Sequence, residues 1–129
     1  MKKYFCILIS SFSLLFFSLN SFGTTYYSIA NTGWATPSTW SQIGCGGAAS
    51  ITAPGAGDDV IICAGTTVIM NGSSVNCNSL TINGVANWAA ALTTNVGAGG
   101  ITINSGGNIT GAVAGILTTT GGLTLNSTL

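Results

Sequence analysis

Residues 99–107 read GGITINSGG, a short β-branched run framed by two glycine pairs. Similar runs recur along the chain, starting 20, 21 and 22 residues apart: VIIC at 60–63, LTIN at 80–83, ITIN at 101–104 and LTLN at 123–126. Short β-branched runs separated by Gly, Asn and Ser are typical of strands joined by turns. A recurrence at this period is typical of a solenoid. The glycines therefore supply the corners of repeated coils.

The repeat predicts an all-β fold. We expect a right-handed parallel β-helix, or β-solenoid, with about three to four coils and an incomplete C-terminal end. The expected coils are 58–78, 79–99, 100–121 and a partial coil at 122–129. An antiparallel sandwich is the alternative, but the tripeptide repeats almost verbatim and the two Asn-Gly pairs lack clear flanking strands. Residues 85–92, VANWAAAL, are the one stretch with a possible helical turn.

Side chains alternate between the two faces of a strand, so the outer residues of each run point inward. We expect two buried columns, one of Val60, Leu80, Ile101 and Leu123 and the other of Ile62, Ile82, Ile103 and Leu125. The central residues form an outward column of Thr81, Thr102 and Thr124. Such an array suggests ice binding as a minor hypothesis, although Thr is simply favoured on half-exposed strands.

An asparagine ends each of the last three runs: Asn83, Asn104 and Asn126. Stacked in register, identical side chains form hydrogen-bonded ladders. Asn also tolerates the left-handed backbone of a sharp corner. We therefore predict an asparagine ladder at one corner of the coils.

Residues 1–23 have the pattern of a secretory signal peptide. Lys2 and Lys3 form a positive region, an apolar run follows, and Ser21 and Gly23 are the small residues of a cleavage site. Serines interrupt the apolar run, which is shorter than the ~20 residues of a membrane-spanning helix. We expect cleavage after Gly23, a secreted or cell-surface protein, and no membrane insertion after cleavage.

After Gly23 the chain has no Lys, Arg, His or Glu, and its only acids are Asp58 and Asp59. Such a chain cannot neutralise phosphates, which excludes nucleic-acid partners. General acid–base catalysis has almost no candidate groups, and Ser or Thr nucleophiles have no base beside them. We therefore expect no enzyme, no catalytic residue and no cofactor.

The acidic pair has two interpretations. Asp58 and Asp59 are weak calcium candidates, because one or two carboxylates make a poor oxygen shell. Neighbours on a strand point to opposite faces, which disfavours a pair acting together on one sugar. We favour a turn in which the aspartates accept hydrogen bonds from local amides.

Three cysteines remain after cleavage, which predicts one disulfide and one thiol in an oxidising compartment. Cys45–Cys63 is the favoured pair, because it would fasten the segment 24–57 to the first coil. Cys63–Cys77 is the alternative. Without histidine, three cysteines fall short of the about four ligands of a structural zinc site.

The segment 24–57 contains both prolines and two of the three tryptophans, and we expect it to form an N-terminal cap. Trp34 and Trp40 are suited to covering the first coil. Together with Trp88 they are also candidates for stacking on a glycan, because aromatic side chains offer large faces.

Three stretches carry a family resemblance: GWATPSTW at 33–40, APGAGDDVIICAGTTVIMNG at 53–72 and NSLTING at 78–84. They resemble the start of the eight-glycine domain, found in secreted proteins linked to hyaluronan processing. They also resemble bacterial surface proteins exported by the type nine secretion system. The resemblance covers most of residues 26–84 and implies a Trp-containing cap, an acidic turn, a parallel β-helix and export to the cell surface.

These observations predict a secreted or cell-surface β-solenoid that serves as a non-catalytic, adhesin-like scaffold. The alternative is the non-catalytic N-terminal part of a glycan-binding or polysaccharide-processing β-helix protein, with an extracellular glycan as its partner. Ice binding is the second alternative. We also expect the open edge of the last coil, 122–129, to pair with another chain, because exposed strand edges invite pairing.

Overall fold

The computed structural model describes residues 23–72, 75–111 and 115–126. The predicted signal peptide, Gly23 excepted, and the last three residues of the partial coil lie outside the described residues. The fold is all-β, as predicted, and the described residues contain one short 3-10 helix and no α-helix. In these three ranges no helix is long and apolar enough to cross a membrane.

The described strands are short, apart from two longer ones in the middle of the chain. They are β1 (Thr25–Ser28), β2 (Trp40–Ser41), β3 (Asp59–Ile62), β4 (Thr67–Met70), β5 (Val75–Ile82), β6 (Val85–Trp88), β7 (Thr93–Asn104), β8 (Asn108–Gly111), β9 (Ile116–Thr119) and β10 (Leu123–Asn126). The 3-10 helix η1 (Pro37–Thr39) directly precedes β2.

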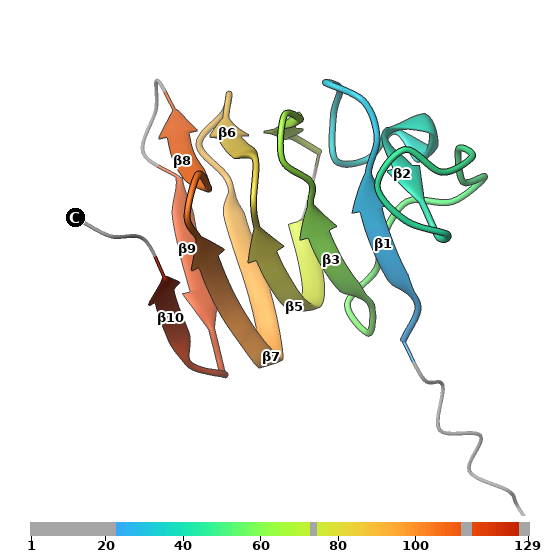
Figure 1. Ribbon diagram of the computed structural model, residues 1–129. Coiled ribbons are helices and arrows are strands. Elements are labelled where there is room, and N and C mark those ends of the chain that lie inside the picture. The colour runs from blue at the N-terminus through green and yellow to red at the C-terminus, as the bar shows by residue number, and fades with distance from the viewer. Residues whose placement is uncertain (1–22, 73–74, 112–114, 127–129) are drawn as a thin grey trace, which may run out of the picture.

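The strands form two separate sheets (Figure 1). The larger sheet has the order β10-β7-β5-β3-β1-β2, and β9 also pairs with β7; the smaller has the order β4-β6-β8. Among the described pairs only β1 and β2 are antiparallel. Parallel neighbours need a crossover connection. Here the crossovers are strands of the smaller sheet: β4 lies between β3 and β5 in the chain, and β6 between β5 and β7.

The two long strands each take part in two stretches of pairing. Residues 75–77 of β5 pair with 94–96 of β7, and residues 79–82 pair with 100–103, with a register shift between Cys77 and Ser79. β9 extends the first stretch and β10 extends the second. Such an irregularity bends a strand. The larger sheet therefore has two arms, one ending in β9 and one ending in β10.

The register of the β10 arm confirms the alignment of both predicted apolar columns, but the predicted burial of their last members, Leu123 and Leu125, is wrong. The pairs are Val60–Leu80, Leu80–Ile101 and Ile101–Leu123 in one column, and Ile62–Ile82, Ile82–Ile103 and Ile103–Leu125 in the other. Leu80 and Ile82 are fully buried, whereas Leu123 is 59% exposed and Leu125 is 61% exposed. Burial thus decreases along both columns toward β10.

The helical turn considered for residues 85–92 is wrong. Val85–Trp88 is strand β6, paired with β4 on one side and β8 on the other. Its side chains alternate, so that Ala86 and Trp88 point into the core. The packing of this pleated, half-buried surface outweighs the helical preference of the neighbouring alanines.

A single hydrophobic core joins the two sheets to the N-terminal segment. Trp34 and Trp40 lie in the same buried cluster as Val68 and Met70 of β4. The Trp34 backbone N–H donates to the carbonyl of Ile69 (2.8 Å), which fixes this segment against β4. Figure 1 shows β1 and β2 at one end of the stack and β8, β9 and β10 at the other.

The columns lead to a test of what holds the larger sheet together. We expect Leu80→Ala to lower the free energy of unfolding by about 2–5 kcal/mol, because it leaves a cavity at a fully buried position. The matched control is Thr81→Ala on the opposite face of β5, with an expected loss below about 1 kcal/mol. Urea denaturation of both variants makes the comparison, and equal losses would contradict the inward and outward assignment.

Candidate functional site

Asp58 joins the turn before β3 to the start of the described chain. Its Oδ1 accepts a hydrogen bond from the backbone N–H of Thr24, and its Oδ2 accepts one from that of Gly55, both at 2.8 Å. The Asp58 N–H in turn donates to the Gly55 carbonyl at 3.0 Å, which closes the turn. This is the local amide binding expected of a turn aspartate.

Asp59 begins β3 and contacts the neighbouring strand. Its Oδ1 accepts hydrogen bonds from Asn78 Nδ2 (2.8 Å) and Ser79 Oγ (2.6 Å). Three of the four carboxylate oxygens of the acidic pair are therefore engaged by protein donors. Within the described ranges, no three His, Cys, Asp or Glu side chains gather as a metal site. Calcium binding by Asp58 and Asp59 stays a prediction.

The favoured disulfide is confirmed: Cys45 and Cys63 are bonded, with their Cα atoms 5.9 Å apart. The bond links the loop after β2 to the end of β3. The Cys63 backbone N–H also donates to Ser28 Oγ of β1 at 2.8 Å. A cross-link over this sequence separation of 18 residues stabilises the folded chain by about 3 kcal/mol, chiefly by restricting the unfolded state.

Cys77 is the free thiol and lies buried in β5. Burial, together with the nearby charges of Asp59 and Asp58, raises the pKa of this thiol to about 12. A thiol that stays protonated is a poor nucleophile and a poor metal ligand. Cys77 therefore acts as a small hydrophobic residue of the core.

The glycan-stacking prediction for the three tryptophans is wrong. Trp34, Trp40 and Trp88 are all buried, with at most 4% of any of them exposed. The Trp34 and Trp40 rings pack edge to face with centroids 5.0 Å apart, and Trp40 Nε1 donates to the Trp34 carbonyl at 2.7 Å. Their faces are thus occupied by protein. Sequence alone favours aromatic residues both for covering a core and for binding sugar, and the structure assigns all three to the core.

The predicted asparagine ladder is present, and its side chains lie where strands β5, β7 and β10 end. Asn104 Nδ2 donates to Asn83 Oδ1, and Asn126 Nδ2 donates to Asn104 Oδ1, each at 2.8 Å. The conformational part of the prediction is wrong, because every described residue with positive φ is a glycine. The asparagines are therefore used for side-chain hydrogen bonds and not for a left-handed backbone.

A second polar ladder lies on the β9 arm, and the sequence analysis missed it. Asn95 Nδ2 donates to Asn76 Oδ1 at 2.9 Å, and Thr118 Oγ1 donates to Asn95 Oδ1 at 2.7 Å. The register aligns Asn76 with Asn95 and Asn95 with Thr118. The sequence signal was weak, because the spacings are 19 and 23 residues and the third member is not an asparagine.

The outward threonines form one column, as the register pairs Thr81 with Thr102 and Thr102 with Thr124. Ile61 occupies the same position on β3, so the hydroxyl column covers only three strands. Ice binding at this column stays a prediction.

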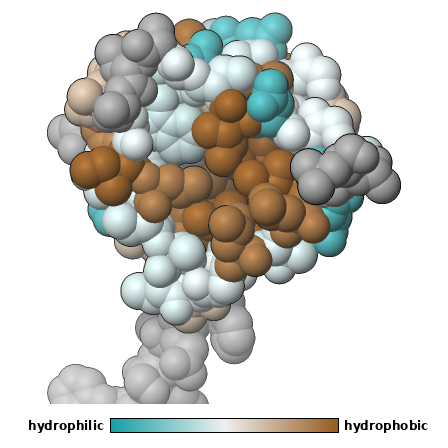
Figure 2. Space-filling view, turned by 90° about the vertical axis from the view of Figure 1, so that its left-hand side faces the viewer, coloured by the Kyte–Doolittle hydropathy of each residue, from teal (hydrophilic) through white to brown (hydrophobic). Residues whose placement is uncertain are grey.

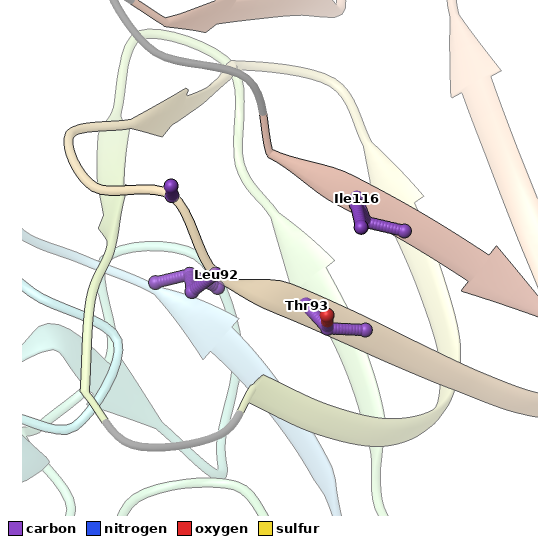
Figure 3. Close-up of a pocket in the computed structure, with 4 residues that line it drawn as sticks. Leu92, Thr93 and Ile116 are labelled. Carbon is purple, nitrogen blue, oxygen red and sulfur yellow. The ribbon is translucent and has the colours of Figure 1, made fainter.

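A pocket of about 190 Å³ lies beside the start of β9 (Figure 3). It is lined by Ala91, Leu92, Thr93 and Ile116, whose side chains are aliphatic apart from one hydroxyl and include no ionisable group. Pockets that hold a drug-sized ligand usually measure about 300–1,000 Å³ and contain several polar groups. This pocket is smaller than that range.

A family model described as the G8 domain matches residues 39–124. The chain belongs to the G8 domain family. The eight-glycine resemblance is thereby confirmed, whereas type nine export stays a prediction. Neither the curated proteins nor the solved structures contain a match to this chain.

The G8 match runs from the last residue of η1 into β10, so it includes the smaller sheet, the larger sheet apart from β1 and the end of β10, the disulfide and the acidic pair. Two of its glycines are required by close backbone approach. A Cβ atom built on Gly84 would overlap the carbonyl oxygen of Cys63, and one built on Gly107 would overlap that of Ile82. At these two positions the G8 fold leaves no room for any side chain.

The buried thiol predicts a pH dependence of stability. Because the folded G8 domain holds the Cys77 proton more tightly than the unfolded chain, this contribution is complete below about pH 9. It falls as the pH rises toward about 12, with a slope of at most about 1.4 kcal/mol per pH unit. Urea denaturation between about pH 8 and pH 11 measures it. Cys77→Ala removes this slope while both proteins keep the same tyrosines, and identical slopes would contradict the assignment.

The asparagine ladder predicts a loss of stability on truncation. Asn104→Ala removes one donated and one accepted side-chain hydrogen bond, and we expect a loss of about 1–3 kcal/mol. Asn108→Ala is the control, because Asn108 is exposed and its side chain bonds to no described residue; its expected effect stays within about 0.5 kcal/mol. Thermal and urea unfolding compare the two, and a loss at Asn108 as large as that at Asn104 would count against the ladder.

Proposed function

We propose that this G8 domain is a non-catalytic, adhesin-like scaffold of a secreted or cell-surface protein. Its two sheets would form successive coils of a right-handed parallel β-solenoid, and the segment 24–57 would be its N-terminal cap. The role of such a scaffold is geometric: it holds whatever it carries at a fixed distance and direction.

The observation that carries the proposal is the parallel pairing of every described strand from β3 to β10. Each passage through the larger sheet, the smaller sheet and back advances the chain by one strand spacing, ~4.8 Å. Because parallel crossover connections are right-handed in about 98% of cases, a right-handed coil is the expected hand. A stack of this kind gains stability from each pair of neighbouring coils.

The two polar ladders support a rigid scaffold. They run along the stack on both arms of the larger sheet, and each links three successive strands through side chains. Side-chain bonds between coils add to the backbone ladder and resist lateral slippage. The Cys45–Cys63 disulfide supports an extracellular setting, because such bonds persist in oxidising compartments.

The chemistry of the chain supports a non-catalytic role. The full sequence has no histidine, and its only basic residues are Lys2 and Lys3. The two aspartates already accept structural hydrogen bonds, and the one free cysteine is buried. The glycan-binding alternative has lost its aromatic candidates, because all three tryptophans are buried. No other observation favours it over the scaffold.

Duplicating one repeat tests the scaffold directly. Residues 80–100 span the 21 positions between Leu80 and its partner Ile101, so a second copy inserted after Gly100 keeps every column in register. We expect the longer protein to fold, to be at least as stable, and to be longer by ~4.8 Å along the stack. Small-angle X-ray scattering and urea denaturation measure length and stability.

The control is the same insertion without its own copy of Thr81. Deleting one strand residue turns the following side chains to the opposite face, so we expect this protein to be strongly destabilised. Equal stability of the two insertions would contradict stacked coils. A glycan array probed with the unmodified chain tests the alternative, and specific binding there would contradict a purely structural role.

A further inference from the structure

The chain contains two Asn-Gly pairs, Asn71–Gly72 and Asn83–Gly84. Neither pair makes the hairpin turn for which this dipeptide is favoured, because the strands on either side of it belong to different sheets. Asn-Gly is also the dipeptide in which the next backbone nitrogen most readily attacks the asparagine side chain, since glycine has no Cβ to obstruct the approach. The two pairs share this chemistry, so a difference in their reactivity has to come from the fold.

The reaction needs no enzyme, and water is its only co-reactant. The glycine nitrogen attacks the side-chain carbonyl carbon of the asparagine and loses its proton as the new C–N bond forms, and the amide nitrogen leaves as ammonia. Water then opens the resulting cyclic imide at either carbonyl, which gives aspartate or isoaspartate. The ring closes only where the side chain can rotate onto the next backbone nitrogen and where that nitrogen can give up its proton.

Both reacting groups of the second pair are held by hydrogen bonds. The Gly84 N–H donates to the carbonyl of Ile62 at 3.1 Å. The Asn83 Oδ1 accepts a hydrogen bond from Asn104 Nδ2 at 2.8 Å. Gly84 is also buried, and a Cβ atom built on it would overlap the carbonyl oxygen of Cys63, so its backbone has little room to move. Ring closure at Asn83 therefore requires that this part of the stack opens first.

The first pair lies in a different setting. Asn71 and Gly72 directly follow β4, and both are exposed. The Asn71 side-chain amide lies over Gly33 and forms no hydrogen bond with another described residue. Gly72 has a φ of 110°, a conformation that glycine adopts far more readily than other residues. The turn thus requires a glycine at the position that makes the preceding asparagine reactive.

We propose that Asn71 is a site of spontaneous deamidation through ring closure onto the Gly72 nitrogen, and that the fold protects Asn83 from the same reaction. The product adds a negative charge after β4, in a chain whose only acids are Asp58 and Asp59. Isoaspartate also carries the main chain through the former side chain, which lengthens the link between β4 and β5. This inference is independent of the scaffold role, because the reaction depends on the turn and not on what the protein carries.

The new charge would lie beside the N-terminal segment. β4 is an edge strand of the smaller sheet, and its residue Ile69 pairs with Gly33 of that segment. The exposed apolar side chains of Ile116, Leu123 and Leu125 lie on β9 and β10, at the end of the molecule where Figure 2 shows a hydrophobic surface. Deamidation therefore changes the charge next to the predicted cap and leaves that hydrophobic surface as it is.

Peptide mapping by mass spectrometry, after incubation of the full chain in mildly alkaline buffer, tests the proposal. Chymotrypsin separates the two sites by cleaving after Leu80, and trypsin does not, because the chain has no Lys or Arg beyond Lys3. We expect aspartate and isoaspartate to accumulate at Asn71 at least about tenfold faster than at Asn83, because reaction at a buried strand end waits for local opening. Asn71→Gln keeps the amide but closes a larger ring more slowly, so we expect it to abolish the product at this position.

The same incubation in guanidinium chloride is the control for the effect of the fold. In the unfolded chain neither Asn-Gly pair is restrained, and we expect the two rates to become similar. A native chain that modifies Asn83 as fast as Asn71 would overturn the proposal. So would a native chain that keeps Asn71 intact while the unfolded chain loses it.

Discussion

The parallel register of β3, β5, β7 and β10 is the constraint on which the rest of the molecule depends. Each strand presents apolar side chains at alternate positions, and the register sets each of them directly against its equivalents on the neighbouring strands. A slip of one residue would move the whole inward set to the solvent face. The two central pairs, Val60 with Leu80 and Ile62 with Ile82, are fully buried, so this is where a slip would cost most.

Fixed register also explains why polar side chains can form ladders. Once Leu80 lies against Ile101, the residue three positions further on must lie against its own equivalent, and Asn83 meets Asn104. A primary amide suits this position, because it donates to one neighbour while it accepts from the other. The ladders are thus a consequence of the apolar register and not its cause, although their hydrogen bonds strengthen it. Close packing of the backbone also explains Gly84 and Gly107. Each lies where a neighbouring carbonyl leaves no space for a Cβ atom.

The repeat therefore made the β10 arm predictable from sequence, including the alignment of both columns and the asparagine hydrogen bonds. The rest was harder because its residues do not repeat. Residues 85–92 read as a possible helix, since alanine is ambiguous until the flanking strands β4 and β8 are known. Trp88 was a candidate sugar platform because composition cannot tell a buried aromatic ring from an exposed one. The Asn76–Asn95–Thr118 ladder escaped because its spacing is irregular and its members differ.

The N-terminal segment and the last described strands differ in how far their side chains are buried. At the β1 end, Trp34 and Trp40 cover the core, Asp58 holds the entering chain, and the Cys45–Cys63 disulfide locks the covering loop in place. At the β10 end, the same apolar columns continue to the surface with no described strand beyond them. The residues that do not repeat, among them the aromatic pair and the cross-linked cysteines, thus fix the N-terminal segment onto β3 and β4, whereas the strands that follow are held to one another by the register of the repeat.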